Sequence, residues 1–108
     1  MKQPTFAAAY VAFYPMLAKL SRENGYTLAI HGSVVSDFDL VAIPWTKDAT
    51  SADTLITTIA NFSGMFGSDR SRILDGPELK EHGRMAWSVI MGNGAVLDFS
   101  IMPMQHDV

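Results

Sequence analysis

The chain has 108 residues, of which 48% are hydrophobic and 18% charged, and its formal net charge is −3 at pH 7. This length supports a single domain spanning residues 1–108, and the composition excludes a disordered chain. Because general binding to nucleic acid requires a surplus of Lys and Arg, we expect none here. The sequence has no cysteine, which excludes disulfides, a thiolate metal site and a cysteine nucleophile.

The N-terminal segment MKQPTFAAAYVAFYPMLA superficially resembles a secretory signal, with one Lys before an apolar patch. Its apolar residues keep a helical period, so we interpret it as part of the fold and expect a cytoplasmic protein. No apolar run reaches the roughly 18 residues of a membrane span, so no membrane association is expected.

The first half of the chain predicts a helix, two strands and a second helix. Pro15 is best tolerated in the first turn of a helix, so the main helix is placed at about 14–24, with Gly25 as its left-handed end. Residues 4–13 are then expected to form a separate helical turn or a kinked extension of this helix. The two strands are expected at 26–30 and 39–43, and the second helix at 52–62.

The second half predicts a long loop and then a hairpin. Glycines, Pro77 and scattered charges between 63 and 83 indicate a loop with one helical turn at about 78–81. Strands are predicted at 84–91 and 95–102, joined by Gly92-Asn93-Gly94 in a type I′ turn. The predicted fold class is α+β: one small mixed sheet of about four strands in the order α-β-β-α-β-β, with helices packed on one face.

Carboxylates on two of these strands form the candidate site. Side chains alternate along a strand, so Asp37 and Asp39 should share one face while Phe38 enters the core. On the last strand Asp98 should likewise point away from the core. If the two strands are neighbours, three carboxylates meet and repel one another unless a cation joins them, which indicates Mg²⁺ or Mn²⁺.

The stretch HGSVVSDFDLVAIPW contains Gly32-Ser33 and then Asp37-Phe38-Asp39, and Asp98 follows on a later strand. In this order the motifs resemble the nucleotidyltransferase superfamily, which includes DNA polymerase beta and the minimal nucleotidyltransferases. More narrowly, the stretch is similar to short phage-encoded proteins with this core, which would place the chain in the host cytoplasm. The resemblance covers about residues 14–102.

The resemblance implies a nucleotidyltransferase-like core and a role for each motif residue. Asp37, Asp39 and Asp98 would be catalytic residues and metal ligands, and Asp98 could also act as the base. Gly32 and Ser33 would hold the phosphates of a nucleoside triphosphate. The implied reaction transfers a nucleotide to a hydroxyl group of a protein or small-molecule acceptor.

Two alternative hypotheses for the function remain open. In the family a longer connection before the Asp-x-Asp carries a helical turn that helps to hold phosphate, whereas here only Val34, Val35 and Ser36 intervene. This favours a catalytically inactive module of the same fold that binds a nucleotide or a protein, while the three aspartates favour an enzyme. The other alternative hypothesis is an interaction protein whose acidic patch is incidental.

Several residues outside the motif have both a structural and a functional interpretation. His31 is expected to be structural or partly exposed, and Trp45 either packs against the core or its rim or stacks on a base. Phosphate contacts could come from the loop residues Arg70, Arg72, Lys80 and Arg84. A methionine cluster near the hairpin could form an apolar partner surface, a homodimer included; its members are Met85, Met91, Met102 and Met104.

Overall fold

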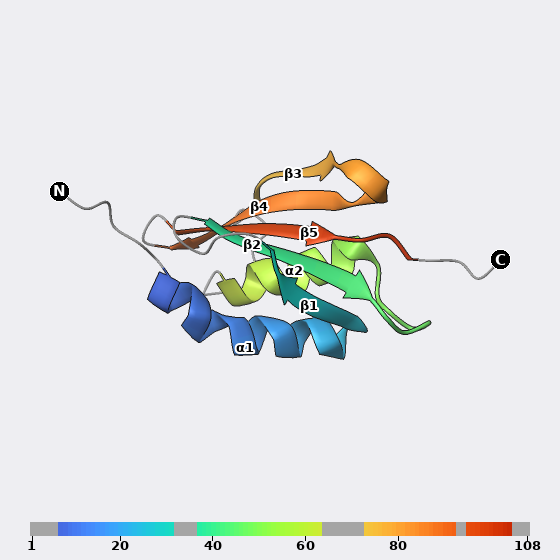
Figure 1. Cartoon of the computed structure of the whole chain (residues 1–108), viewed down its shortest axis with the longest axis horizontal. Coiled ribbons are helices and arrows are strands. Elements are labelled where there is room, and N and C mark those ends of the chain that lie inside the picture. The colour runs from blue at the N-terminus through green and yellow to red at the C-terminus, as the bar shows by residue number, and fades with distance from the viewer. Residues whose placement is uncertain (1–6, 32–36, 64–72, 93–94, 105–108) are drawn as a thin grey trace.

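The structure, a computed structural model, describes residues 7–31, 37–63, 73–92 and 95–104. The described residues form two helices and five strands, with a short 3₁₀ turn before the fourth strand (Figure 1). The elements are α1 Ala7–Glu23, β1 Tyr26–Ile30, β2 Asp37–Pro44, α2 Ala52–Ser63, β3 Ile73–Leu79, η2 Glu81–Gly83, β4 Met85–Gly92 and β5 Ala95–Ile101.

The five strands form one mixed sheet in the order β1-β2-β5-β4-β3. The strands β2 and β5 are parallel, and every other neighbouring pair is antiparallel. Both helices lie on the same face of the sheet (Figure 1). The predicted α+β class is therefore confirmed, but the sheet has five strands where about four were expected.

The core lies between the helices and the sheet. Alternate residues of β2 and β5 enter it, and Phe38, Leu97 and Phe99 are fully buried. The helix α2 contributes Leu55 and Ile59, which are also fully buried. Burial of each large apolar side chain contributes about 1.5–3 kcal/mol, so this interface supplies most of the force that holds the helices on this face.

The first helix runs without a break from Ala7 to Glu23, so the helical turn expected before the main helix is part of it from Ala7 onward, and Pro15 lies in its interior. Proline has no backbone N–H and clashes with the preceding turn, at a cost of about 3 kcal/mol, which is why the sequence suggested a later start. Packing outweighs this cost because Leu17 is completely buried on the far side of Pro15 and Phe13 packs against the core before it. The predicted end of the helix is confirmed, since Gly25 has a φ of 88°.

The strand β3 was not predicted, and its segment had been expected to be a loop with a helical turn. Gly76-Pro77 lies inside the strand, and its register with β4 shifts on both sides of Asp75. Glycine and proline normally mark turns, so an irregular edge strand of this kind carries the signature of a loop. The predicted turn at about 78–81 corresponds instead to the end of β3 and the start of η2.

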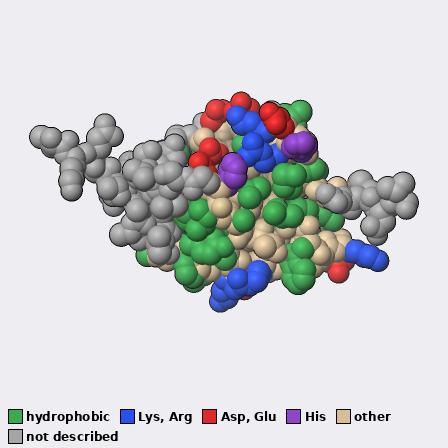
Figure 2. All heavy atoms as spheres, in the orientation of Figure 1, with side chains coloured by type: hydrophobic (Ala, Val, Ile, Leu, Met, Phe, Trp, Pro, Cys, Tyr) green, Lys and Arg blue, Asp and Glu red, His purple; other side chains and the backbone are tan. Residues whose placement is uncertain are grey.

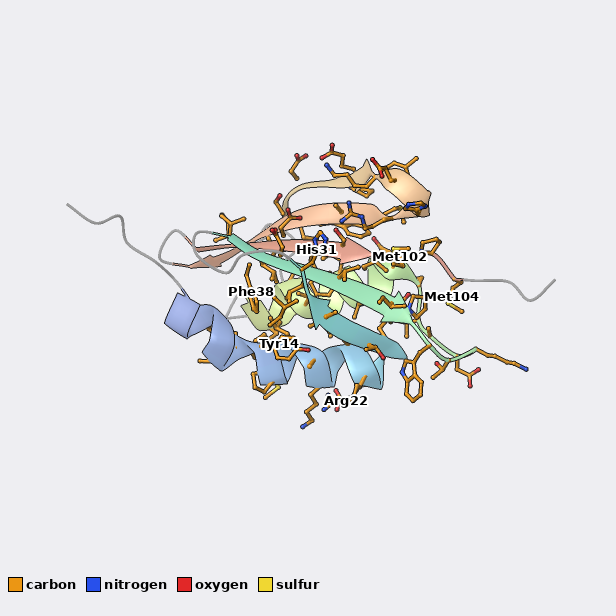
Figure 3. All side chains as sticks on the ribbon, viewed as in Figure 1. Tyr14, Arg22, His31, Phe38, Met102 and Met104 are labelled. Carbon is orange, nitrogen blue, oxygen red and sulfur yellow. The ribbon has the colours of Figure 1, made fainter. Side chains whose placement is uncertain are left out.

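Each outer strand of the sheet carries a feature that covers or disrupts its free edge. On β1, the hydroxyl of Tyr14 donates a 2.6 Å hydrogen bond to the carbonyl oxygen of Leu28. His31 pairs with β2 through its N–H, so by the alternation of antiparallel pairing the carbonyl of Leu28 points away from β2. Figure 3 shows Tyr14 lying beside Phe38 and β1. On β3, Pro77 removes a backbone donor.

The hairpin of β4 and β5 is close to the predicted one, although the Asn93-Gly94 turn lies outside the described residues. The predicted methionine cluster is wrong in one respect. Met85 starts β4 and Met91 lies near its other end, roughly 20 Å away at about 3.3 Å per residue. Met85 packs against the core, while Met102 and Met104 follow β5 at the same end of the hairpin.

Candidate functional site

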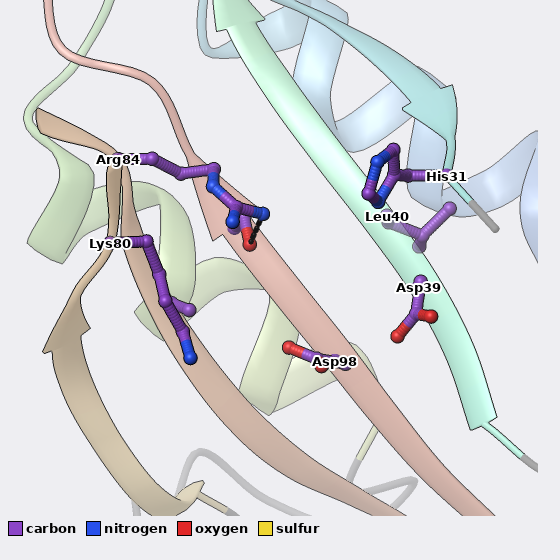
Figure 4. Close-up of a pocket in the computed structure, with 8 residues that line it drawn as sticks. His31, Asp39, Leu40, Lys80, Arg84 and Asp98 are labelled. Atoms are coloured by element: carbon purple, nitrogen blue, oxygen red, sulfur yellow. Dashed lines mark hydrogen bonds between the residues drawn. The ribbon is translucent and has the colours of Figure 1, made fainter. Parts of the chain in front are cut away.

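The sheet face opposite the helices brings together two aspartates that are far apart in the sequence. Asp39 on β2 and Asp98 on β5 are register partners on parallel strands. Residues at one register position project to the same face, so both carboxylates lie on the side away from the buried Phe38 and Phe99. Both aspartates are partly exposed and line the same pocket (Figure 4).

The other predicted site residues are placed less completely. The backbone of Asp37 starts β2, in register with Val96, but its side chain lies outside the described part of the structure. Gly32 and Ser33 lie wholly outside the described residues. Of the three predicted aspartate side chains, the structure therefore places Asp39 and Asp98.

A pocket of about 220 Å³ opens over these two aspartates (Figure 4). Sites that enclose whole drug-sized ligands begin at about 300 Å³, so this pocket suits one polar end of a larger ligand. It is lined by His31, Asp39, Leu40, Lys80, Arg84, Ala86, Asp98 and Ser100.

His31 borders the pocket at the end of β1. Its backbone N–H donates a 2.7 Å hydrogen bond to the carbonyl oxygen of Asp39, which extends the pairing of β1 with β2 by one residue. Directly paired residues project to the same face, so the exposed imidazole stands beside the Asp39 carboxylate (Figure 4). Of the two alternatives expected for His31, the structure therefore shows the exposed one, with the side chain at the pocket.

Lys80 and Arg84 form the opposite wall of the pocket. The N–H of Lys80 donates a 2.7 Å hydrogen bond to the carbonyl oxygen of Arg84, so the two residues close the β3–β4 connection as an antiparallel pair. The guanidinium of Arg84 donates through Nη1 to Oγ of Ser100 at 3.2 Å, and Ser100 is buried. The ammonium of Lys80 lies 3.0 Å from Oε1 of Glu78.

The described side chains that line the pocket carry two negative and two positive charges, which sum to zero with His31 neutral. In Figure 4, Asp98 lies between Asp39 on one side and the two cations on the other. Among the described residues, no salt bridge joins Asp98 to Lys80 or Arg84. Figure 2 shows charged side chains of both signs gathered at the top of the view, above a more hydrophobic area.

The carboxylate pair offers oxygen ligands of the kind that Mg²⁺ and Mn²⁺ prefer. Within residues 7–31, 37–63, 73–92 and 95–104, no three His, Asp or Glu side chains gather closely enough to hold a metal ion. Magnesium commonly binds through one or two carboxylates and retains several waters, so Asp39 and Asp98 fit part of such a shell.

The sequence did not predict that two cations lie beside the aspartates. Lys80 and Arg84 were candidates for phosphate contacts, but their position depends on β3, which was not predicted. Arg70 and Arg72 lie outside the described residues. Trp45, the candidate for base stacking, is 68% exposed at the end of β2 and does not line the pocket, whereas Trp87 belongs to the core.

Comparison of the chain with models of known protein families, with curated proteins and with solved structures finds no match. The fold and the pocket therefore define the class that can be stated, a small α+β protein with a charged pocket on the open face of a mixed sheet. In the described part of the chain, neither helix has the length and hydropathy needed to cross a membrane.

Proposed function

We propose that the chain is a small metal-dependent nucleotidyltransferase with a core like that of the nucleotidyltransferase superfamily. The register of Asp39 with Asp98 is the observation that carries this proposal, because it provides two carboxylates at one point on the open face. Two like charges held this close repel each other, and a divalent cation would convert the repulsion into attraction.

In this proposal Asp37, Asp39 and Asp98 hold Mg²⁺ or Mn²⁺, which would neutralise charge on the phosphates of a nucleoside triphosphate. A hydroxyl oxygen of a protein or small-molecule acceptor attacks the α-phosphorus. The bond from that phosphorus to the oxygen bridging to the β-phosphate breaks, and pyrophosphate leaves. The proton of the acceptor hydroxyl passes to the carboxylate of Asp98, and Gly32 and Ser33 contact the phosphates.

The second candidate function is a catalytically inactive module of the same fold that binds a nucleotide or a protein. The three-residue connection between Ser33 and Asp37 favours it, since so short a segment cannot form a phosphate-binding helical turn. The two candidates share the metal site and differ in whether a nucleotide is transferred.

Thermal unfolding with Mg²⁺ or Mn²⁺ and each nucleoside triphosphate tests the shared metal site. Binding to the folded state at about ten times the dissociation constant should add roughly 1.4 kcal/mol to the free energy of unfolding. We expect Asp39→Asn and Asp98→Asn to remove this gain, and Asp48→Asn, an exposed carboxylate away from the pocket, to keep it. A gain that survives in both pocket variants would contradict the metal site.

Transfer separates the enzyme from the inactive module. The chain is incubated with a radiolabelled triphosphate, Mg²⁺ and a cell lysate that supplies acceptors. Label that becomes attached to an acceptor with wild type and not with Asp98→Asn supports the enzyme. Stabilisation by the nucleotide without any transferred label supports the module.

A further inference from the structure

We propose that Lys80 and Arg84 form a polyphosphate subsite that holds the β- and γ-phosphates of the nucleotide beside Asp98. The inference rests on the proposed function for the identity of the nucleotide, although binding of a polyphosphate at this subsite does not require the metal. It assigns a phosphate grip to the β3–β4 connection, through two cations that line the pocket.

The first observation behind this proposal is the pairing of two like charges. A 2.7 Å backbone hydrogen bond fixes Lys80 opposite Arg84, and directly paired residues of antiparallel strands project to the same face. Like charges in this arrangement repel each other. A bound anion with several oxygens would remove that repulsion and accept hydrogen bonds from both cations.

The second observation is that the side chain of Arg84 is held in one orientation, whereas Lys80 can exchange its present partner for a phosphate. The guanidinium of Arg84 is oriented by its 3.2 Å hydrogen bond to Ser100, whose side chain is only 4% exposed. Arginine can present two parallel N–H groups to a phosphate, so an oriented guanidinium sets the direction of binding. The salt bridge of Lys80 with Glu78 joins side chains that are 39% and 64% exposed, and a polyphosphate can displace so exposed a partner.

The third observation is the position of Asp98 between the two walls (Figure 4). A metal ion at Asp39 and Asp98 would lie next to phosphates held by Lys80 and Arg84. The pocket is too small for a whole nucleotide but has room for a metal and a short polyphosphate. The leaving pyrophosphate would then occupy the cationic wall, with the sugar and base outside the pocket.

Binding of inorganic pyrophosphate in the presence of EDTA tests the subsite without the metal. Affinity is measured by calorimetry for wild type and for the double variant Lys80→Met with Arg84→Gln. We expect the double variant to bind at least about tenfold more weakly, because two charge-assisted contacts are lost. The matched control removes the same charges from α1 through Lys19→Met with Arg22→Gln, and we expect it to bind within about twofold of wild type.

Three further comparisons decide the interpretation. Arg84→Lys, which keeps the charge but not the planar fork, should bind with intermediate affinity, and it provides a second variant if the double one does not fold. Asp98→Asn should bind metal-free pyrophosphate more tightly, since a neighbouring negative charge is removed. Sulfate that binds as tightly as pyrophosphate, or pyrophosphate that binds the double variant as well as wild type, would overturn the proposal.

The result also separates this inference from the proposed function. Pyrophosphate binding that depends on Arg84, together with no effect of Mg²⁺ on stability, would support the subsite and refute the metal site. Metal-dependent stabilisation by a triphosphate that is unchanged in the double variant would support the metal site and refute the subsite. Ser100 is a positioning residue in this proposal, so Ser100→Ala should weaken pyrophosphate binding and Ser100→Thr, which keeps the hydroxyl, should restore it.

Discussion

Asp39 and Asp98 occupy the same register position on two parallel strands, so two carboxylates stand side by side on the open face of the sheet. In the absence of a cation this pairing is unfavourable, and like charges directly opposite each other cost roughly 0.2–1 kcal/mol. Asp98→Asn removes one charge with almost no change in shape. Without metal, we therefore expect it to raise the free energy of unfolding by this amount.

Urea denaturation in EDTA at low ionic strength measures the effect of Asp98→Asn. The gain should shrink as salt is added, because screening weakens the repulsion in wild type. The control is Asp48→Asn, whose carboxylate is exposed and away from the pocket. A loss of stability in Asp98→Asn would show that the attraction of this carboxylate to Lys80 and Arg84 outweighs its repulsion of Asp39.

Tyr14→Phe isolates the hydrogen bond that covers the edge of β1. The substitution keeps the ring, which packs edge-on against Phe38 at 6.5 Å between centroids, and removes the donor to Leu28. We expect the free energy of unfolding to fall by about 1 kcal/mol, the usual net value of a hydrogen bond. Hydrogen exchange gives a local measurement, since the substitution should speed the exchange of β1 amides, relative to wild type, more than that of β5 amides.

Gly25→Ala tests the tight turn between α1 and β1. A Cβ added there would lie 2.6 Å from the Cα of Ala49 and 2.7 Å from Oγ1 of Thr46, at a φ of 88°. We expect a loss of about 2 kcal/mol or more in the free energy of unfolding, from the left-handed backbone and the clash together.

Gly83→Ala is the matched control for that turn. Gly83 has a φ of 76°, but a Cβ there would meet only Pro103, with 3.2 Å to its Cγ. The expected loss is smaller, about 1 kcal/mol, because the left-handed backbone costs the same while the contact with Pro103 is less severe than the one with Ala49. Equal losses at the two glycines would contradict the role assigned to the packing of Gly25 against Ala49.

Tyr26 should make the free energy of unfolding fall as the pH becomes alkaline. Burial raises the pKa of its hydroxyl above the usual 10.0, and the hydroxyl donates a 2.6 Å hydrogen bond to the carbonyl oxygen of Thr50. Because the folded-state pKa is raised, this contribution is fully present below the unfolded pKa and is lost as the pH rises through the folded pKa.

Urea denaturation from about pH 8 to about pH 11 follows this loss. Tyr26→Phe should be less stable than wild type by about 1 kcal/mol at the lower pH, and the difference should shrink above about pH 10 as wild type loses its contribution. Stability curves that stay parallel over the whole range would contradict the assignment of this effect to Tyr26.

The sequence predicted the regular parts of this fold because their patterns agree with their packing. The alternation around Phe38 and Leu97 identified two strands with one face in the core, and the polar Ser51 directly precedes α2. Its Oγ accepts a 3.2 Å hydrogen bond from the N–H of Thr54. The second helix, predicted at 52–62, is observed at Ala52–Ser63.

The strand β3 and the continuity of α1 through Pro15 could not be predicted from local pattern. In both, a proline breaks the local rule, and contacts distant in the sequence compensate. Pro15 is carried by a helix packed on the sheet, and Pro77 by pairing of β3 with β4. Local pattern contains no information about these partners, so the first segment was divided at Pro15 and the second was assigned to a loop.

The candidate site was predictable only as far as strand alternation reaches. Alternation put Asp39 and Asp98 on the open face, but their common register depends on the parallel pairing of β2 with β5, which is a property of the whole sheet. The approach of Lys80 and Arg84 requires β3 and its tight connection to β4, so no local signal could place these cations beside Asp98.

The protected borders of the sheet restrict how two copies of the chain could associate. A partner strand that approached β1 would meet the hydroxyl of Tyr14 at Leu28, and one that approached β3 would meet Pro77 and the shifted register. Strand addition and fibril growth both need a straight, open border. Strand addition at β1 or β3 is therefore disfavoured, which leaves the faces of the described sheet and its exposed apolar side chains as the surfaces through which two copies would associate.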